Sequence, residues 1–188
     1  MILTDREIQI AIESKLIVID PLPSDEAYSS TSLDLTLDET VSHFKIGTTG
    51  LDLIADPSKK GFDHEKVAKQ LLDPFKISSG GYVFEPGKLL LAWTREYIAL
   101  RPEAKVAARV EGKSSLARYG IVVHMTAPVI HSGFEGQIRL EMFNHGPIPV
   151  LLKIGMKICQ LVFEQTLGTP VCGYKGRFSG QTSKDKTG

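Results

Sequence analysis

Apolar and polar residues alternate with two different periods along the chain, and the first period is helical. In LTDREIQIAIESKL, the apolar residues Ile8, Ile12 and Leu16 recur at the spacing of one helix face. Thr4 followed by Glu7 has the pattern of a capping box, in which each side chain binds the other residue's backbone N–H. The pattern predicts a short N-terminal helix that ends before VIDPLP.

After this helix the period changes to two. Apolar and polar residues alternate in STSLDLTLDE, with Leu33, Leu35 and Leu37 set against Asp34, Thr36 and Asp38. This alternation predicts a half-buried strand. Further along, GFDHEKVAKQLLDPF predicts a short surface helix that stops before Pro74, and no function is assigned to it.

From about Gly80 the chain is a series of short apolar runs broken by Gly and Pro. GYVFEPGKLLLAWTREYIAL reads as two strands around a Pro86-Gly87 turn, and KVAARVEG, YGIVVHM, GQIRLEMFN, IPVLL and MKICQLVFE follow. Many short strands with frequent turn signals favour a sandwich, a jelly roll or a related barrel-like fold. The tail from about 175 to 188 has no apolar periodicity and is predicted to be flexible.

Composition and charge narrow the class of protein. The chain has 188 residues, 42% of them hydrophobic and 23% charged, which favours a single domain over residues 1–188. Lys plus Arg equals Asp plus Glu, at 22 each, so a general nucleic-acid or membrane-surface binder is not expected and any anion site must be local. Cys159 and Cys172 make no disulfide framework, and no signal peptide or membrane span is recognisable. These features predict a soluble cytoplasmic protein.

The stretch EGKSSLARYG at 111–120 ends like a phosphate-binding loop, but the rest of that motif is missing. A Walker loop would need Gly at position 107, where the chain has Ala107, and no long helix follows. A zinc deaminase would need H-x-E and P-C-x-x-C, and the chain contains neither motif. The G-x-S-x-G elbow of serine hydrolases is also missing.

Between 112 and 141 the chain concentrates hydrogen-bond donors, anion binders and one carboxylate. Alternation places Glu141 on the strand face opposite Ile138, Leu140 and Met142. That face is either an ordinary solvated face or, because Phe143 shares it, a partly desolvated one that raises the carboxyl pKa into the range of acid–base catalysis. The other polar residues here can be explained by ordinary structural roles, as surface charges, as turn residues or, for His124, as a hydrogen-bonded core histidine.

Taken together, GKSSLARYGIVVHMTAPVIHSGFEGQIRLEMFN resembles the central signature of the dCTP deaminase family, whose fold is related to that of the trimeric dUTPases. The matching blocks are basic-Ser-Ser-Leu-Ala-Arg-x-Gly, V-H-x-T-A, I-x-x-G-aromatic-x-G and L-E. The resemblance extends to the N-terminal segment, EPGKLLLAWT, IGMKICQLVF and the GRFSGQ tail, and is weakest over 46–76. It implies a mainly β, distorted jelly-roll subunit of the dUTPase-like type, a homotrimer, and deamination of dCTP to dUTP and ammonia without zinc.

The resemblance also implies roles for individual residues. Its catalytic set falls on Glu141, Ser114, Arg118 and the backbone carbonyl of Ala127. Glu141 would carry protons, Ser114 and Ala127 would hold the attacking water, and Arg118 would support the carboxylate. The substrate-binding set falls on Lys113, Ser115, Met125, Ile130, His131, Tyr174, Arg177 and Gln181. Mg²⁺ would accompany the triphosphate of dCTP, and dTTP would be an inhibitor.

One position departs from the family pattern. His131 stands where the family block has Asp, the residue that in dUTPases contacts the sugar and positions the hydrolytic water. The imidazole of histidine is larger than the carboxylate of aspartate and is a weaker base for positioning water. The departure therefore lowers the expectation of dUTP hydrolysis. Two alternatives stay open: a bifunctional enzyme that gives dUMP and pyrophosphate, and a nucleotide-binding regulator without turnover.

Overall fold

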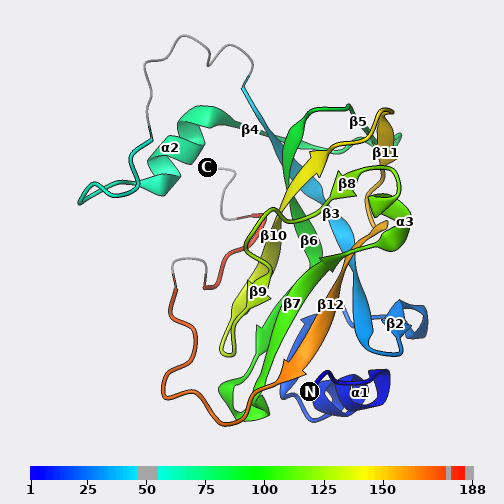
Figure 1. Cartoon of the computed structure of the whole chain (residues 1–188), viewed down its shortest axis with the longest axis vertical. Helices are drawn as coiled ribbons and strands as arrows, with labels where there is room; N and C mark the ends of the chain where they lie inside the picture. Colours follow the sequence, from blue (N-terminus) through cyan, green and yellow to red (C-terminus); the bar gives the residue numbers. More distant parts are fainter. Residues whose placement is uncertain (46–54, 177–178, 185–188) are drawn as a thin grey trace.

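Antiparallel strands make up most of the chain in the computed structural model, which describes residues 1–45, 55–176 and 179–184 (Figure 1). Ten of them form one curled sheet, whose main path runs β8-β10-β6-β3-β12-β7-β9. On this path and beside it the strands are β1 (Ile17–Asp20), β2 (Tyr28–Ser29), β3 (Ser32–Phe44), β4 (Leu72–Lys76), β6 (Leu89–Leu100), β7 (Val106–Gly112), β8 (Ile121–Val122), β9 (Val129–Ile130), β10 (Glu135–Asn144) and β12 (Lys157–Gln165). β5 (Tyr82–Phe84) and β11 (Val150–Leu152) form a separate pair.

The helices are short and lie outside the sheet. They are α1 (Asp5–Glu13), α2 (His64–Leu71) and α3 (Ser114–Ala117), with 3₁₀ turns η1 (Asp25–Ala27) and η2 (Pro102–Ala104). The predicted capping box at the start of α1 is present, and Ile8 on this helix is buried. Among the described residues, no helix combines the length and the hydropathy that crossing a bilayer requires.

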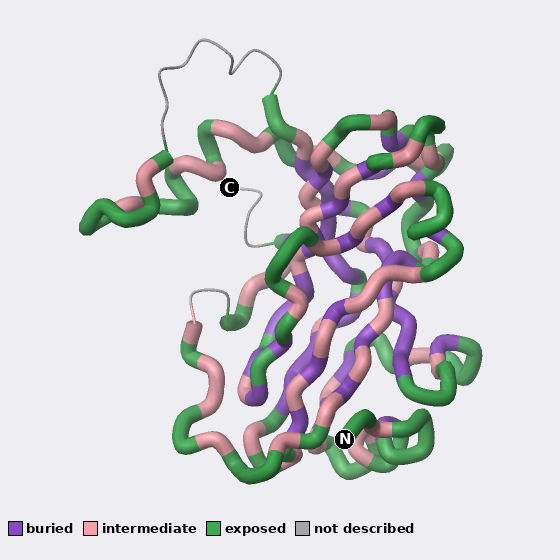
Figure 2. Tube along the Cα trace, in the orientation of Figure 1, coloured by how far each residue is buried: buried purple, intermediate pink, exposed green. Residues whose placement is uncertain are grey.

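The core is built from the alternating apolar positions of the long strands. Figure 2 shows buried positions alternating with intermediate ones along the strands, while helices and connections are mostly exposed. Leu33, Leu35 and Leu37 on β3 are fully buried, as the alternation predicted. The polar face of β3 is less exposed than expected, since Asp34 is also buried. The ammonium groups of Lys113 and Lys157 contact the Asp34 carboxylate on this face.

The helix predicted to stop before Pro74 is α2, and a strand that was not predicted follows it. The structure ends α2 at Leu71, and Leu72–Lys76 forms strand β4, which contains Pro74. Among the described strands β4 pairs with β3 alone, and an edge strand tolerates proline because one of its sides needs no ladder hydrogen bond. Both Cys159 and Cys172 are free thiols.

Candidate active site

Glu141 lies on β10, on the face opposite the buried Ile138, Leu140 and Met142. Its strand partner on β6 is Leu91, and its own side chain is half-buried. Burial raises the pKa of the Glu141 carboxyl above its ordinary value, against the lowering effects of its backbone hydrogen bond and of the positive charges of Arg139 and His124. The structure therefore supports the interpretation in which this strand face is partly desolvated, and not the one in which it is an ordinary solvated face.

An irregularity in the pairing of β10 with β6 places a second charged group on this face. The register shifts between Gln137 and Arg139, so that Arg139 lies opposite Trp93. The centre of the guanidinium lies 5.0 Å from the centroid of the Trp93 ring, a cation–π contact. Gln137 and Thr94 stabilise the irregular segment, because the Gln137 amide donates to the Thr94 carbonyl at 2.9 Å and Thr94 Oγ1 accepts from the Ile138 N–H at 3.0 Å.

His124 approaches the same carboxylate from the loop that follows β8. It is half-buried, and within the described part of the chain its Nδ1 is buried without a hydrogen-bond partner. Arg139 Nε is likewise buried without a hydrogen-bond partner among the described residues. Sequence reasoning treated His124 as a core histidine, although it belongs to the V-H-x-T-A block, and gave Arg139 no role. For Arg139, the available sequence signal was the alternation that places it on the same strand face as Glu141.

The Ser-Ser-Leu-Ala-Arg block forms α3, a single helical turn that follows β7. Ser114, Ser115 and Arg118 are all exposed, and their side chains form no hydrogen bond or ion pair with the described residues. Leu116 alone turns inward and is buried. The structure of one chain therefore places the Ser114 hydroxyl and the Arg118 guanidinium at the surface, and no hydrogen bond joins them to Glu141.

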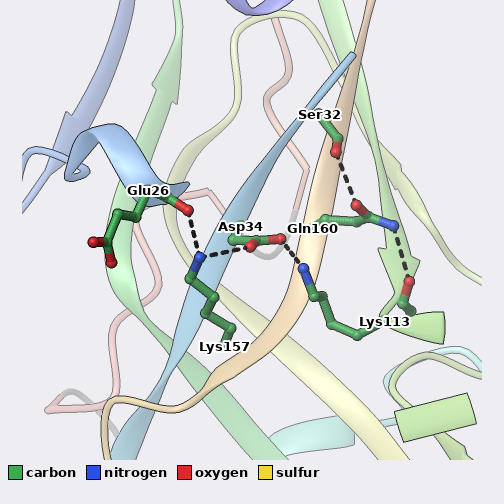
Figure 3. A network of polar contacts seen from close by, with 7 residues as sticks. Glu26, Ser32, Asp34, Lys113, Lys157 and Gln160 are labelled. Carbon is green, nitrogen blue, oxygen red and sulfur yellow. Dashed lines mark hydrogen bonds and ion pairs between the residues drawn. The ribbon is translucent and has the colours of Figure 1, made fainter. Parts of the chain in front are cut away.

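Lys113, at the start of α3, is held by a buried carboxylate on β3 (Figure 3). The Lys113 ammonium contacts Asp34 Oδ1, and the Lys157 ammonium of β12 lies 3.2 Å from Asp34 Oδ2. The side chain of Asp34 is only 5% exposed, so this carboxylate depends on the two lysines for compensation of its charge. Lys113 is thereby fixed relative to the sheet.

Gln160 forms the second half of this network (Figure 3). Its Oε1 accepts from the Ser32 hydroxyl at 2.8 Å, and its Nε2 donates to the Gly112 carbonyl at 3.0 Å. The network joins β3, β12 and the end of β7, so the backbone just before α3 has a defined position.

The other predicted substrate-binding residues are distributed over two segments. Met125 and Ala127 are exposed in the loop between β8 and β9, whereas Ile130 is buried on β9 opposite Ala108. His131 is exposed at the start of the β9–β10 turn. Arg177 lies outside the described residues.

The C-terminal tail passes close to this turn and returns along β10 (Figure 1). The Tyr174 N–H donates to the Ser132 carbonyl at 3.0 Å, and the Tyr174 ring stacks on His131. Gln181 forms a parallel bridge with Gly136, and its Nε2 donates to the Gln137 carbonyl at 3.0 Å. The tail thus brings two predicted substrate-binding residues to the strand that carries Glu141.

Two glycines permit this close approach. At Gly133, with φ +85°, an added Cβ would lie 2.5 Å from the Tyr174 nitrogen. At Gly136, with φ +143°, it would lie 2.8 Å from the Gln181 carbonyl oxygen. Both positions combine a backbone conformation that favours glycine with a neighbour that leaves no room for a side chain.

Comparison with known proteins places this geometry in a family. Residues 2–166 match the family model described as dCTP deaminase-like. The chain belongs to the dCTP deaminase-like family. Curated relatives agree: a "dCTP deaminase, dUMP-forming" of Methanothermobacter thermautotrophicus is 40% identical over 170 residues, which cover 90% of this chain and 81% of the relative. A "dCTP deaminase" of Shewanella loihica is 39% identical over 172 residues, covering 91% and 86%.

Solved structures confirm the dUTPase-like fold that the family resemblance implied. The crystal structure of 2′-deoxycytidine 5′-triphosphate deaminase from Agrobacterium tumefaciens matches with a TM-score of 0.66 at 22% identity. That match covers 86% of this chain, which spans about half of the solved chain (47%). A dUTPase from phage phi11 of S. aureus matches with a TM-score of 0.50 at 10% identity, over 87% of this chain and 99% of the dUTPase.

Within the dCTP deaminase-like family, the residues that the resemblance selected fall into two groups in this structure. The first group comprises Glu141 on β10, His131 on the turn before β10, and Tyr174 and Gln181 on the tail that docks against them. The block from Lys113 to Arg118 lies on and around α3, with its hydroxyls and guanidinium directed to solvent. The roles of these residues remain predictions.

Proposed function

We propose that the protein catalyses the hydrolytic deamination of dCTP to dUTP and ammonia, with Glu141 as the proton carrier and without zinc. Relatives from Rhodospirillum rubrum and Shewanella loihica bear the name "dCTP deaminase" without the dUMP-forming qualifier. The observation that carries the proposal is the half-buried carboxyl of Glu141, whose pKa burial raises toward the range in which one group acts as base and then as acid.

The proposed reaction needs one water molecule and two proton transfers. Glu141 takes a proton from the water as its oxygen attacks C4 of the cytosine ring, and delivers a proton to N3. It then relays the remaining proton of the former water to the exocyclic amino group, which leaves as ammonia. Ser114 and the Ala127 carbonyl orient the water, so their contribution is one of positioning. Arg118 stabilises the charge that develops on the ring.

The surface position of α3 supports a homotrimer in which sites form between subunits. Ser114 and Arg118 are exposed, and no hydrogen bond or ion pair joins them to Glu141 of their own chain. Exposed apolar side chains lie nearby, with Tyr119 53% and Met125 55% exposed. A neighbouring copy would cover these side chains and would bring the α3 block of one subunit to the Glu141 of another.

The triphosphate of dCTP would bind between the α3 block and the tail. Lys113 and Ser115 lie at the start of α3, and Tyr174 and Gln181 lie on the docked tail. Both oxygens of Asp34 are engaged by lysines, and in the described ranges no three His, Cys, Asp or Glu side chains are grouped to hold a metal. We expect Mg²⁺ to arrive on the phosphate oxygens of the nucleotide and to supply charge neutralisation there.

Ammonia release from dCTP by the purified protein tests the proposal. Activity should persist in the presence of a zinc-selective chelator when Mg²⁺ is replenished, and should be lost in Glu141→Gln, which keeps the size of the side chain but cannot carry the proton. Full activity in Glu141→Gln would exclude the proposed mechanism.

A second candidate activity gives dUMP and pyrophosphate from dCTP, and one observation favours it. Curated relatives at 36% and 40% identity bear the name "dCTP deaminase, dUMP-forming". His131 in place of the family's Asp argues for dUTP as the product instead. Separation of the nucleotide products, with an assay for pyrophosphate, distinguishes the two. Tight binding of dCTP or dTTP without any product would instead indicate a regulator, and inhibition by dTTP is expected of an active enzyme.

A further inference from the structure

Arg139 occupies a position where the fold alone does not require a cation. It lies two residues before Glu141 on the same face of β10, with its guanidinium 5.0 Å from the centroid of the Trp93 ring. In the described part of the chain its Nε is buried without a hydrogen-bond partner, and none of the ion pairs found there includes Arg139. An unbranched apolar side chain such as methionine could cover Trp93 without desolvation of a charge.

The surroundings of Glu141 contain few other charges. The strand partner on β6 is Leu91, and the buried residues Leu140 and Met142 flank Glu141 on its own strand. Among the described residues, Arg139 from β10 and His124 from the loop after β8 are the groups whose positive charge favours the ionised carboxylate. The guanidinium of Arg139 stays charged throughout the range in which enzymes work.

We propose that Arg139 is a positioning residue of the active site: held over Trp93, it keeps the Glu141 carboxyl available as a base at neutral pH. The inference rests on the proposed role of Glu141 as proton carrier. Burial and Arg139 act on this carboxyl in opposite directions, and an acid–base catalyst needs both, because it must give up and take back a proton within each turnover. Trp93 fixes the distance over which the guanidinium acts, since the ring holds it by a cation–π contact.

Titration of the Glu141 carboxyl by NMR, in protein labelled with ¹³C at glutamate side chains, tests the inference without reference to turnover. The Glu141→Gln variant assigns the resonance. Arg139→Met should raise the pKa of Glu141, and Arg139→Lys should return it toward the wild-type value because the charge is restored. Arg139→Gln serves as a second neutral variant should the methionine variant fail to fold.

Arg109→Met provides the matched control. Arg109 is also a strand arginine with a buried, unpartnered Nε, but it lies on β7 and pairs with Glu164 at 2.9 Å. The control should leave the pKa of Glu141 unchanged. In active protein, the acid limb of the kcat/KM profile should move to higher pH in Arg139→Met and not in Arg109→Met.

An unchanged pKa of Glu141 in both neutral variants would overturn the inference, as would equal shifts in Arg139→Met and Arg139→Lys. Absence of dCTP turnover in the wild-type protein would reject the proposed function while the titration still decided the role of Arg139. The two failures are therefore distinguishable.

Discussion

The imidazole ring of His131 stacks on the phenol ring of Tyr174, with centroids 5.5 Å apart and planes inclined by 17°. The contact joins the turn before β10 to the C-terminal tail, and the Tyr174 N–H reinforces it by donating to the Ser132 carbonyl at 3.0 Å. An aspartate, which the family resemblance leads one to expect at 131, could not form such a stack. We therefore expect this position to affect the docking of the tail and, as the family resemblance implies, the handling of water near the nucleotide.

Replacement of His131 by Asp should separate these two properties. The carboxylate restores a strong acceptor for water and for a sugar hydroxyl, so His131→Asp should release more pyrophosphate from dCTP or dUTP than the wild-type protein does. His131→Asn is the control, because it also removes the stack but carries no charge. Equal pyrophosphate release in the wild type and His131→Asp would show that this residue does not determine the product.

Gly133 should be the residue whose replacement most directly weakens tail docking. Gly133→Ala would place a Cβ 2.5 Å from the Tyr174 nitrogen in a backbone with φ +85°. Gly61→Ala is a matched control, because Gly61 has the same φ of +85° and nothing within 4 Å of the added Cβ. Both variants should lose roughly 1–2 kcal/mol from the left-handed backbone alone.

Only Gly133→Ala should in addition accelerate hydrogen exchange at the amides of Tyr174 and Gly180, which donate to Ser132 and Glu135. Its KM for dCTP should rise several-fold, because the tail carries predicted nucleotide contacts. Equal exchange rates in the two variants would mean that the tail docks independently of this turn.

Asp34 should contribute more to stability than the exposed ion pairs of the protein. Asp34→Asn keeps the shape of the side chain but leaves Lys113 and Lys157 without their counter-charge, and should lower the free energy of unfolding by about 2 kcal/mol. Glu39→Gln breaks the exposed pair between Lys76 and Glu39 and should lower the free energy of unfolding by less than Asp34→Asn does, because solvent screens exposed charges. Urea unfolding at one protein concentration compares them, and equal costs would contradict the structural role of Asp34.

Local patterns of the sequence predicted the elements well where one face is buried. The capping box of α1 and the alternation on β3 and β10 are confirmed, because burial of one face fixes the register of a strand. The helix before Pro74 is confirmed, but strand β4, which follows it and contains Pro74, was not predicted. The reason is that the tolerance of an edge strand for proline depends on which strand is its neighbour, and the local sequence does not contain that information.

The candidate site was predictable only in part for a similar reason. Glu141 could be placed on a strand face opposite apolar residues, and the resemblance to the family selected it as the catalytic residue. The approach of Arg139 to Trp93 depends on a register shift between two strands far apart in the sequence. The Lys113–Asp34 contact likewise joins residues separated by 79 positions, and no local pattern specifies such a pair.

Mixed subunits should restore an activity that neither parent variant has. If Glu141 of one subunit works with Arg118 of another, Glu141→Gln and Arg118→Met homotrimers should both be inactive. Trimers reassembled from the two should regain part of the wild-type rate, because some interfaces then contain an intact glutamate and an intact arginine. Co-refolding with a tag on each variant, followed by an ammonia assay of doubly tagged protein, measures the recovery. Failure to recover in confirmed mixed trimers would place both residues in a site within one chain.

Glu141 should lower the stability of the protein at neutral pH, and the pH dependence of this effect has a definite sign. Burial raises the pKa of its carboxyl in the folded protein above the ordinary value of 4.5, so the folded state binds the proton more tightly than the unfolded state does. When the pH is below the ordinary pKa, the Glu141 carboxyl is protonated in both the folded and the unfolded protein, so folding buries no charge. As the pH rises through the raised pKa, the free energy of unfolding falls.

Glu141→Gln has no such titration. Its free energy of unfolding should equal that of the wild type near pH 4 and exceed it at pH 7, although the variant is expected to be inactive. Glu103→Gln, at an exposed position in η2, should not change the difference between the two pH values. A Glu141→Gln variant that is less stable than the wild type at pH 7 would mean that the carboxylate is stabilised by its surroundings, and would remove the desolvation on which its proposed acid–base role depends.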